Sequence, residues 1–248
     1  MRIGRGDLGV MVLNWVSRHG EVAYPEATAY AGKSKLEVLI GPGVWDEVRG
    51  KTVLDFGSGT GQEAVEAAER GALKVIGLEL REKWLDMAKA HAEARGMSEK
   101  CLFASEYHGE VDTIISLDSF EHFDDPADIL RRMAALLKPG GKVLVSFGPT
   151  WYHPLGGHFF SVFPWSHLLF SERSQLKWRA IYKGGDYRTF MEVGLNKMTI
   201  RRFRRLVDES PFKFASFEAV PIRRLARVHN LLTREFTSAI VRGVLVKR

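Results

Sequence analysis

A single cysteine, Cys101, is all that this chain contains. One thiol excludes an internal disulfide, and the scarcity of cysteine fits a reducing cytoplasm. Long hydrophobic runs are also missing, since no window approaches the roughly 18 apolar residues of a transmembrane helix. The N-terminus lacks an apolar region followed by a small-residue cleavage site, so we expect no secretory signal. The sequence therefore predicts a cytoplasmic protein.

Acidic residues are scarce at the C-terminal end. Residues 199–248 contain 12 Lys or Arg and 4 Asp or Glu, whereas residues 1–198 contain 24 basic and 26 acidic residues. A basic end can attract nucleic acid or anionic lipid. Because it lacks an aromatic-basic binding motif, we expect a solvated helix face and no obligatory nucleic-acid partner. Peripheral membrane contact remains an alternative.

Glycines at alternate positions follow an apolar run within residues 52–61. The run contains Asp55, and the glycines are Gly57, Gly59 and Gly61. Such a strand–glycine loop–helix unit is typical of nucleotide binding, because glycine permits backbone angles that a Cβ forbids and lets a ligand approach the main chain. Its G-x-G-x-G spacing differs from the G-x-G-x-x-G of dinucleotide sites, which disfavours a nicotinamide oxidoreductase. An acid two residues before the first glycine suits a cationic ligand without phosphate.

A second apolar run, residues 73–79, ends in Glu79, 18 residues after Gly61. A carboxylate at the tip of the second strand is the usual partner of ribose hydroxyls. The glycine loop with both acids in register resembles motifs I and II of the class I S-adenosylmethionine (SAM) methyltransferases. The resemblance covers residues 50–148 most fully.

Strands and helices alternate between residues 50 and 148, which predicts a parallel sheet with helices on both faces. We expect residues 138–141 to interrupt the regular structure before the next strand. We also expect a helix at 224–237 and two late strands, one of them antiparallel at the edge. With the family resemblance, this predicts an α/β fold: a doubly wound, mostly parallel, Rossmann-like sheet of seven strands. The expected organisation is an N-terminal helical cap (1–50), a SAM-binding core (51–148), an insert (149–197) and a C-terminal completion of the sheet (198–248).

The resemblance also implies residues that bind SAM. Asp55 and the glycine loop would meet its methionine part, Glu79 the ribose, and Leu80 the adenine. Ser105 or Glu106 would meet the adenine amine. The predicted cofactor-binding residues are Asp55, Gly57, Ser58, Gly59, Gly61, Glu79, Leu80, Ser105 and Asp118.

Residues 112–118 resemble motif IV, and Asp118-Ser-Phe-Glu121-His122 follows at its end. A Glu-His pair here is often structural in the wider family. In ubiquinone-pathway O-methyltransferases, a similar acid-x-x-Glu-His run binds a divalent cation that polarises a catechol. The resemblance implies that Asp118, Glu121 and His122 are metal ligands, with Mg²⁺ suited to the oxygens and Mn²⁺ or Zn²⁺ compatible with the imidazole.

Histidine can also act as a general base, because it titrates near neutrality. His122 is the first candidate, with His153, His158 and His167 as rivals. His158 leads the rivals, since Gly156 and Gly157 predict a tight, exposed turn around it. A lone histidine is more often a hydrogen-bonded structural residue.

The insert, residues 149–197, holds 11 of the 27 aromatic residues and three of the eight histidines. Above the carboxyl ends of the strands, such a segment is most often a lid that lines a substrate site. A small accessory core or a homodimer interface would be equally aromatic. Tyr24, Tyr30 and Lys35 could reach the ligand, but helical caps need such residues for packing, so they stay outside the predicted site.

These features predict a SAM-dependent methyltransferase that methylates a hydroxyl of an aromatic or apolar small molecule. One alternative is a lipid- or glycan-linked substrate at a membrane surface, with the basic C-terminal region used for docking. Another is nucleic-acid binding or methylation, which the lack of an Asn/Asp-Pro-Pro-Tyr tetrad disfavours.

Overall fold

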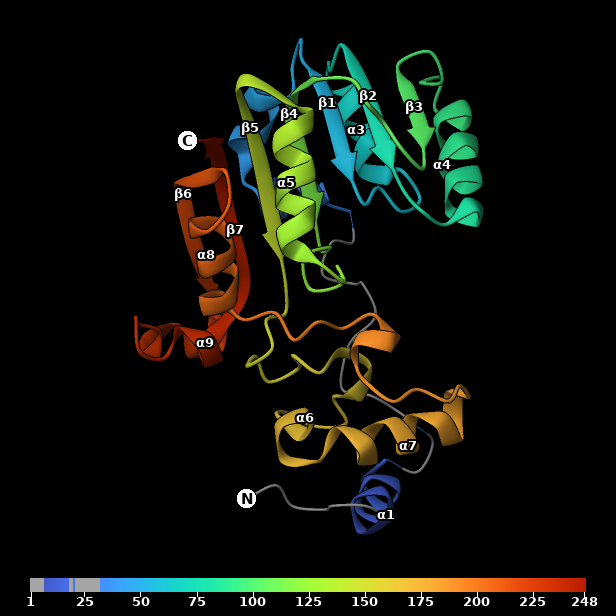
Figure 1. Ribbon diagram of the computed structural model, residues 1–248, viewed down its shortest axis with the longest axis vertical. Coiled ribbons are helices and arrows are strands. Elements are labelled where there is room, and N and C mark those ends of the chain that lie inside the picture. Colours follow the sequence, from blue (N-terminus) through green and yellow to red (C-terminus); the bar gives the residue numbers. More distant parts are fainter. Residues whose placement is uncertain (1–6, 18–19, 21–31) are drawn as a thin grey trace.

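A seven-stranded sheet forms the centre of the computed structural model, which describes residues 7–17, 20 and 32–248 (Figure 1). The strand order is β3-β2-β1-β4-β5-β7-β6. The first five strands are parallel to one another, whereas β7 is antiparallel to both β5 and β6. The predicted fold is confirmed. The strands are β1 Thr52–Phe56, β2 Lys74–Leu78, β3 Cys101–Ala104, β4 Val111–Leu117, β5 Leu137–Phe147, β6 Phe212–Pro221 and β7 Ser238–Lys247.

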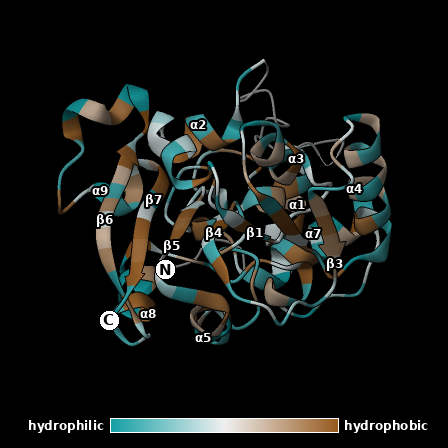
Figure 2. Ribbon diagram, turned by 90° about the horizontal axis from the view of Figure 1, so that it is seen from above, coloured by the Kyte–Doolittle hydropathy of each residue, from teal (hydrophilic) through white to brown (hydrophobic). Residues whose placement is uncertain are grey.

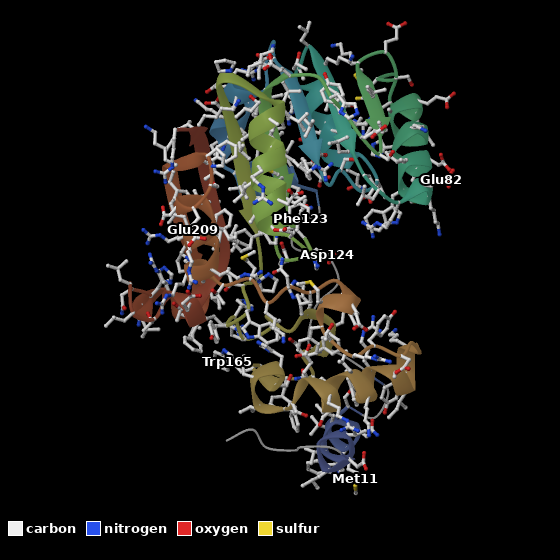
Figure 3. All side chains as sticks on the ribbon, in the orientation of Figure 1. Met11, Glu82, Phe123, Asp124, Trp165 and Glu209 are labelled. Atoms are coloured by element: carbon white, nitrogen blue, oxygen red, sulfur yellow. The ribbon has the colours of Figure 1, made fainter. Side chains whose placement is uncertain are left out.

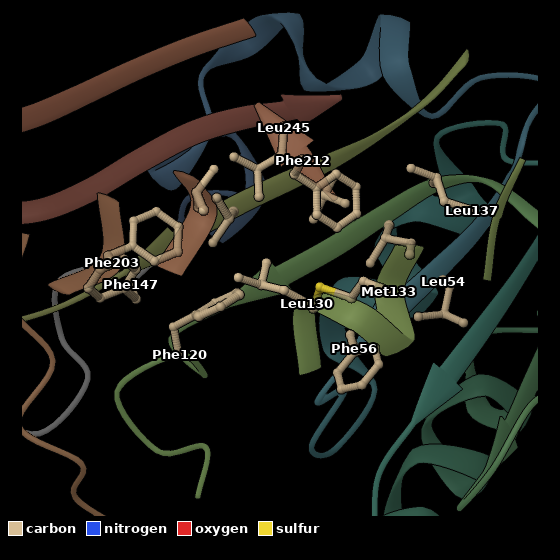
Figure 4. Packing of buried hydrophobic residues seen from close by; sticks show 14 of the residues in the cluster. Leu54, Phe56, Phe120, Leu130, Met133, Leu137, Phe147, Phe203, Phe212 and Leu245 are labelled. Atoms are coloured by element: carbon tan, nitrogen blue, oxygen red, sulfur yellow. The ribbon is translucent and has the colours of Figure 1, made fainter. Parts of the chain in front are cut away.

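Alternate residues of the strands face opposite hydrophobic cores, as a period of two requires. Val53 packs with one set of helices, and the next residue, Leu54, packs with the other. Figure 4 shows the second of these cores, and Figure 2 shows hydrophobic residues along the strands. One face carries α2 Lys35–Leu39, η2 Pro42–Glu47, α3 Gln62–Glu69 and α4 Glu82–Ala94; the other carries α5 Pro126–Leu136 and α8 Ile200–Asp208.

Three local expectations are wrong. The antiparallel strand is not at the edge, because β7 lies between β5 and β6. Residues 138–141 do not interrupt the regular structure before β5. Strand β5 begins at Leu137 and includes them, and its register against β4 shifts at this point. Residues 224–237 are not one helix; they contain two short helices, η5 (Arg223–Val228) and α9 (Arg234–Thr237).

The insert forms a separate layer below the carboxyl ends of the strands (Figure 1). Its helices are η3 His158–Phe160, α6 Ser166–Leu169, α7 Glu172–Lys183 and η4 Met191–Val193. Trp151, Phe160 and Phe190 form a core of the insert with its other apolar side chains. Many of its aromatic residues therefore serve an accessory core, one of the two alternatives to a lid.

The N-terminal region divides between the two layers. Helix α1 (Asp7–Val16) packs on α7, and its Leu13 shares a core with Trp178 of the insert. Helix α2 and η2 pack on the sheet instead. Tyr24 and Tyr30 lie outside the described residues. Among the residues that are described, no helix is long and apolar enough to cross a bilayer.

Candidate active site

The glycine loop joins β1 to α3 at the carboxyl edge of the sheet. Its glycines have positive φ, which is +52° at Gly59 and +76° at Gly61. A Cβ on Gly61 would lie 2.8 Å from both Phe103 and Ala88, so this glycine is required by packing as well as by backbone angle. Gly61 thus sets the close approach of α3 to β3 and α4.

Several amides of this loop are bonded within the protein. The N–H groups of Gly57 and Ser58 both donate to the Leu78 carbonyl at 2.9 Å, and Gly61 N–H donates to the Ser58 carbonyl at 2.8 Å. The Ser58 side chain is buried. The first two bonds hold the loop against the end of β2 and the third closes the loop itself, so the predicted ligand contacts of Gly57, Ser58 and Gly61 would not come from their N–H groups.

Asp55 is a buried acid that forms no ion pair with the residues that the structure describes. It is 4% exposed, and its Oδ2 has no hydrogen-bond partner among the described residues. Burial raises the pKa of Asp55 to about 8; the charges of Glu63 and Glu79 add to this, and Lys35 opposes it. A buried carboxylate oxygen without a partner fits a cationic ligand group, such as the ammonium of SAM.

Glu79 follows the end of β2, the strand that pairs beside Asp55. Its carboxylate accepts hydrogen bonds from the backbone N–H and the guanidinium of Arg81, at 3.0 to 3.2 Å. Burial alone would raise the pKa of Glu79, but the bonds from Arg81 hold it below its ordinary value. The guanidinium also stacks on Trp84, with Cζ 3.2 Å from the ring centre. An ionised carboxylate in this position retains acceptor capacity for hydroxyl groups.

Two other predicted cofactor residues lie at the surface of the same edge. Leu80 is 80% exposed directly after Glu79, and Ser105 is exposed directly after β3. Both follow strands whose carboxyl ends meet at this edge. Their roles beside adenine stay predictions.

Lys35 forms ion pairs with two acids from different elements, a link that the sequence does not predict. Its Nζ lies 3.1 Å from Asp118 at the end of β4 and 3.4 Å from Glu63 of α3. Asp118 has a φ of +47°, a strained angle that asparagine and aspartate tolerate best and that often marks functional sites. Burial raises the pKa of Asp118, and the charge of Lys35 opposes that shift.

Glu121 is buried in the turn after β4. One carboxylate oxygen, Oε1, accepts from Gly148 N–H at 3.2 Å, and Oε2 has no partner among the described residues. Burial and the charge of Asp118 raise the pKa of Glu121 to about 8.

Asn196 of the insert closes this turn from below. Its Nδ2 donates to the carbonyls of Phe120 and Phe123, at 2.6 and 2.8 Å, and its backbone N–H donates to the Glu121 carbonyl at 3.0 Å. Figure 3 shows Phe123 and Asp124 between the sheet and the insert. The sequence had given no signal for Asn196, because its partners are backbone atoms.

His122 and His158 face each other across the junction of core and insert. Their ring centres are 5.4 Å apart. His122 Nδ1 bonds the Gly194 carbonyl at 2.6 Å, and His158 Nδ1 bonds the Gly156 carbonyl at 3.1 Å. A carbonyl only accepts, so each Nδ1 carries a proton.

His158 does not lie in an exposed turn, so that expectation is wrong. It is 5% exposed with a φ of +50°, and the close approach of Gly156 and Gly157 to neighbouring atoms buries the turn. Burial, followed by the charge of His122, lowers the pKa of His158 to about 4.

Ligand atoms of Glu121, His122 and His158 lie within 4.8 Å of one another, and in the described part of the chain this is the group that could hold a metal ion. Asp118 is not a member, since its carboxylate pairs with Lys35. One carboxylate and two imidazoles suit Mn²⁺, Zn²⁺ or Fe²⁺ better than Mg²⁺.

The rival bases His153 and His167 serve the insert itself. His153 Nδ1 accepts from Leu155 N–H at 2.9 Å, and His167 Nε2 bonds the Trp151 carbonyl at 2.7 Å. Burial lowers the pKa of both to about 4. These histidines stay neutral and hold turns of the insert.

Comparison with known proteins identifies relatives of this chain. A family described as a methyltransferase domain matches residues 35–213. The ubiquinone biosynthesis O-methyltransferase of Idiomarina loihiensis is 37% identical over 107 residues, which are 41% of this chain and 44% of that enzyme. The chain thus spans less than half the length of the curated relatives it matches.

Solved structures share the fold. An S-adenosylmethionine dependent methyltransferase from Mesorhizobium loti has a TM-score of 0.52 and 21% identity, over 82% of this chain and 93% of that chain. A geranyl diphosphate methyltransferase in complex with SAM has a TM-score of 0.54 and 17% identity, over 82% of each chain. Identities this low establish the fold alone.

Proposed function

Because this chain belongs to the methyltransferase domain family, as a class I SAM-dependent enzyme, we propose that it methylates a hydroxyl group of an aromatic or apolar small molecule. The observation that carries the proposal is the buried Asp55, with an unpartnered oxygen beside the glycine loop and with Glu79 at the end of the adjacent strand. The O-methyltransferase relatives support a hydroxyl as the acceptor.

On the donor side, SAM would supply an electrophilic methyl group on a cationic sulfonium. Asp55 would bind the ammonium of the methionine part, and Glu79 the ribose hydroxyls. Arg81 positions the Glu79 carboxylate through three hydrogen bonds. Holding donor and acceptor in one orientation is the main contribution that an enzyme makes to such a displacement.

On the acceptor side, His122 Nε2 would take the proton of the attacking hydroxyl. The Gly194 carbonyl fixes the tautomer that leaves this atom free to accept, at 2.6 Å from Nδ1. His122 is exposed, whereas Glu121 and His158 beside it are buried. We therefore assign the proton transfer to His122 and a positioning role to its two neighbours.

A divalent cation is the second candidate role for this group, favoured by the convergence of Glu121, His122 and His158. An ion held there would lower the pKa of a bound hydroxyl without a protein base. The two roles compete for His122 Nε2. Activity that EDTA abolishes and Mn²⁺ restores would favour the cation, and activity that EDTA leaves unchanged would favour the base.

Two experiments test the proposal. Calorimetry should detect SAM binding that Asp55→Asn weakens by about 10-fold or more, as loss of a charge-assisted contact predicts. Asp46→Asn, at an exposed acid paired with Arg49, is the matched control and should bind as the parent does. A mass-spectrometric screen of phenols, catechols, sugars and lipids should find methylated phenols or catechols. Absence of SAM binding by the parent chain would contradict the proposal.

A cytoplasmic site of action and a homodimer formed through the insert accompany this proposal. The single cysteine supports the first, and the aromatic content of the insert supports the second. Cell fractionation and light scattering would test them.

A further inference from the structure

The connection between β6 and β7, residues 222–237, lies at the same edge of the sheet as the candidate active site. Strand β7 is antiparallel to β5 and to β6, so β6 runs in the direction of β5 and ends at the carboxyl edge. The connection contains η5 and α9 and projects beside the insert (Figure 1).

Apolar side chains of this connection point into solvent. Leu231 is 78% exposed and Leu232 is 92% exposed, next to Val228 at 54% and Phe236 at 44%. Figure 2 shows hydrophobic and hydrophilic residues side by side in this projecting segment. Single exposed leucines are ordinary, but Val228, Leu231 and Leu232 are three exposed apolar residues within five consecutive positions, which favours an interaction surface.

Hydrogen bonds define the tip of this connection. Asn230 Oδ1 accepts from the backbone N–H groups of Leu232 and Thr233, at 2.8 and 3.2 Å. Thr233 Oγ1 in turn donates to the Val228 carbonyl and accepts from Asn230 N–H. The backbone of the tip is thus held by polar groups, while both leucines remain outside any hydrophobic core.

The charge of the connection is positive and uncompensated. It contains four arginines and one acid, Glu235. The Glu235 carboxylate accepts from the backbone N–H groups of Ile200 and Arg201 at the start of α8, at 3.1 and 2.8 Å. No ion pair is formed within the described residues by Arg223, Arg224, Arg227 or Arg234.

We propose that residues 222–237 dock the protein on an anionic lipid surface. Leu231 and Leu232 insert among the acyl chains, and the arginines meet the lipid phosphates, the pattern by which short amphipathic segments bind interfaces. Nucleic acid would satisfy the arginines but would leave Leu231 and Leu232 in water. A second copy of this chain would bring the same positive charge against itself.

Docking at this place would orient the active site. Phe236 of α9 packs on Tyr152 of the insert, with ring centres 5.1 Å apart. The connection therefore contacts the layer that covers the carboxyl edge of the sheet. Membrane docking goes beyond the methyl-transfer proposal and does not rest on it, because it can be measured without SAM or an acceptor.

Vesicle sedimentation with the full chain tests the inference. We expect binding to phosphatidylglycerol–phosphatidylcholine vesicles and little binding to pure phosphatidylcholine. The double variant Leu231→Glu/Leu232→Glu should weaken binding by about 100-fold or more, given the apolar area of two leucines. The triple variant Arg223→Gln/Arg224→Gln/Arg227→Gln should weaken it by about 100-fold and remove its dependence on salt.

Leu73→Glu is the matched control. Leu73 is 69% exposed but precedes β2, at the opposite edge of the sheet, so vesicle binding should not change. All variants replace exposed side chains, and an unchanged thermal midpoint would show that they fold. Either of two results with vesicles would overturn the inference: no binding by the parent, or equal binding by the parent and the double variant. It would also be overturned if the leucine substitutions abolished oligonucleotide binding or dimerisation and left vesicle binding unchanged.

Discussion

The ammonium of Lys35 lies 3.1 Å from the carboxylate of Asp118 and so ties the first residue of α2 to the end of β4. The same ammonium lies 3.4 Å from Glu63. Its charge also opposes the raised pKa of Asp55. One cation therefore compensates three acids at the carboxyl edge of the sheet.

Lys35→Met should reduce the free energy of unfolding by about 1–3 kcal/mol, between the values for exposed and buried pairs, because two half-buried carboxylates lose their cation. Urea titration at pH 7.5 measures this. Lys177→Met is the control, since Lys177 pairs with the exposed Asp7 and its loss should reduce the free energy of unfolding by clearly less. Equal losses in the two variants would contradict a special role for Lys35.

Asp55→Asn should change how stability depends on pH in the absence of ligand. The folded pKa of Asp55, about 8, is above its ordinary value of 3.8. Between these values the folded chain keeps a proton that the unfolded chain has lost, so stability falls as pH rises. Asparagine removes this contribution. Urea unfolding at pH 5 and pH 8 should show a smaller loss in the variant than in the parent, whereas equal losses would contradict the assignment.

His122→Gln should lower kcat by about 10²–10⁴-fold if this imidazole is the general base. The SAM dissociation constant should not change, since the predicted donor contacts involve other residues. Single-turnover assays with the acceptor found in the screen measure the rate, and His108→Gln, at an exposed histidine near Glu106, is the control. A loss of SAM affinity in place of rate would argue against the assigned role.

Asn196→Ala should destabilise the turn after β4. The variant leaves the carbonyls of Phe120 and Phe123 without their donor, at a cost of about 1–3 kcal/mol for each buried group. Activity should fall as well, because the turn carries Glu121 and His122. Urea unfolding and kcat measure the two effects, and a variant of unchanged stability would show that water replaces the amide.

The proximity of Asp55 and Glu79 could be predicted from the sequence, for a physical reason. Asp55 and Glu79 lie at the ends of apolar runs, and parallel strands bring their carboxyl ends to one edge. Local pattern and sheet topology thus suffice to bring these two acids together. Thr199 is the N-cap of α8, and its hydroxyl accepts from Arg202 N–H, three residues on.

The contacts of Lys35, Asn196 and His158 at this edge of the sheet are not encoded in any local pattern. Lys35 reaches Asp118 only after α2 has packed on the sheet, and Asn196 bonds carbonyls that any sequence would supply. The burial of His158 depends on the fold of the whole insert. The position of β7 between β5 and β6 likewise follows from pairing, since both late strands alternate alike in sequence.

The insert leaves and re-enters the core at one point, where Trp151 N–H donates to the Met198 carbonyl at 2.7 Å. A segment whose two ends meet can lengthen, shorten or be exchanged without moving the sheet. The core around Trp151 and Phe160 is formed entirely by this segment. Relatives could therefore differ in the length of this segment while the sheet and the glycine loop stay the same.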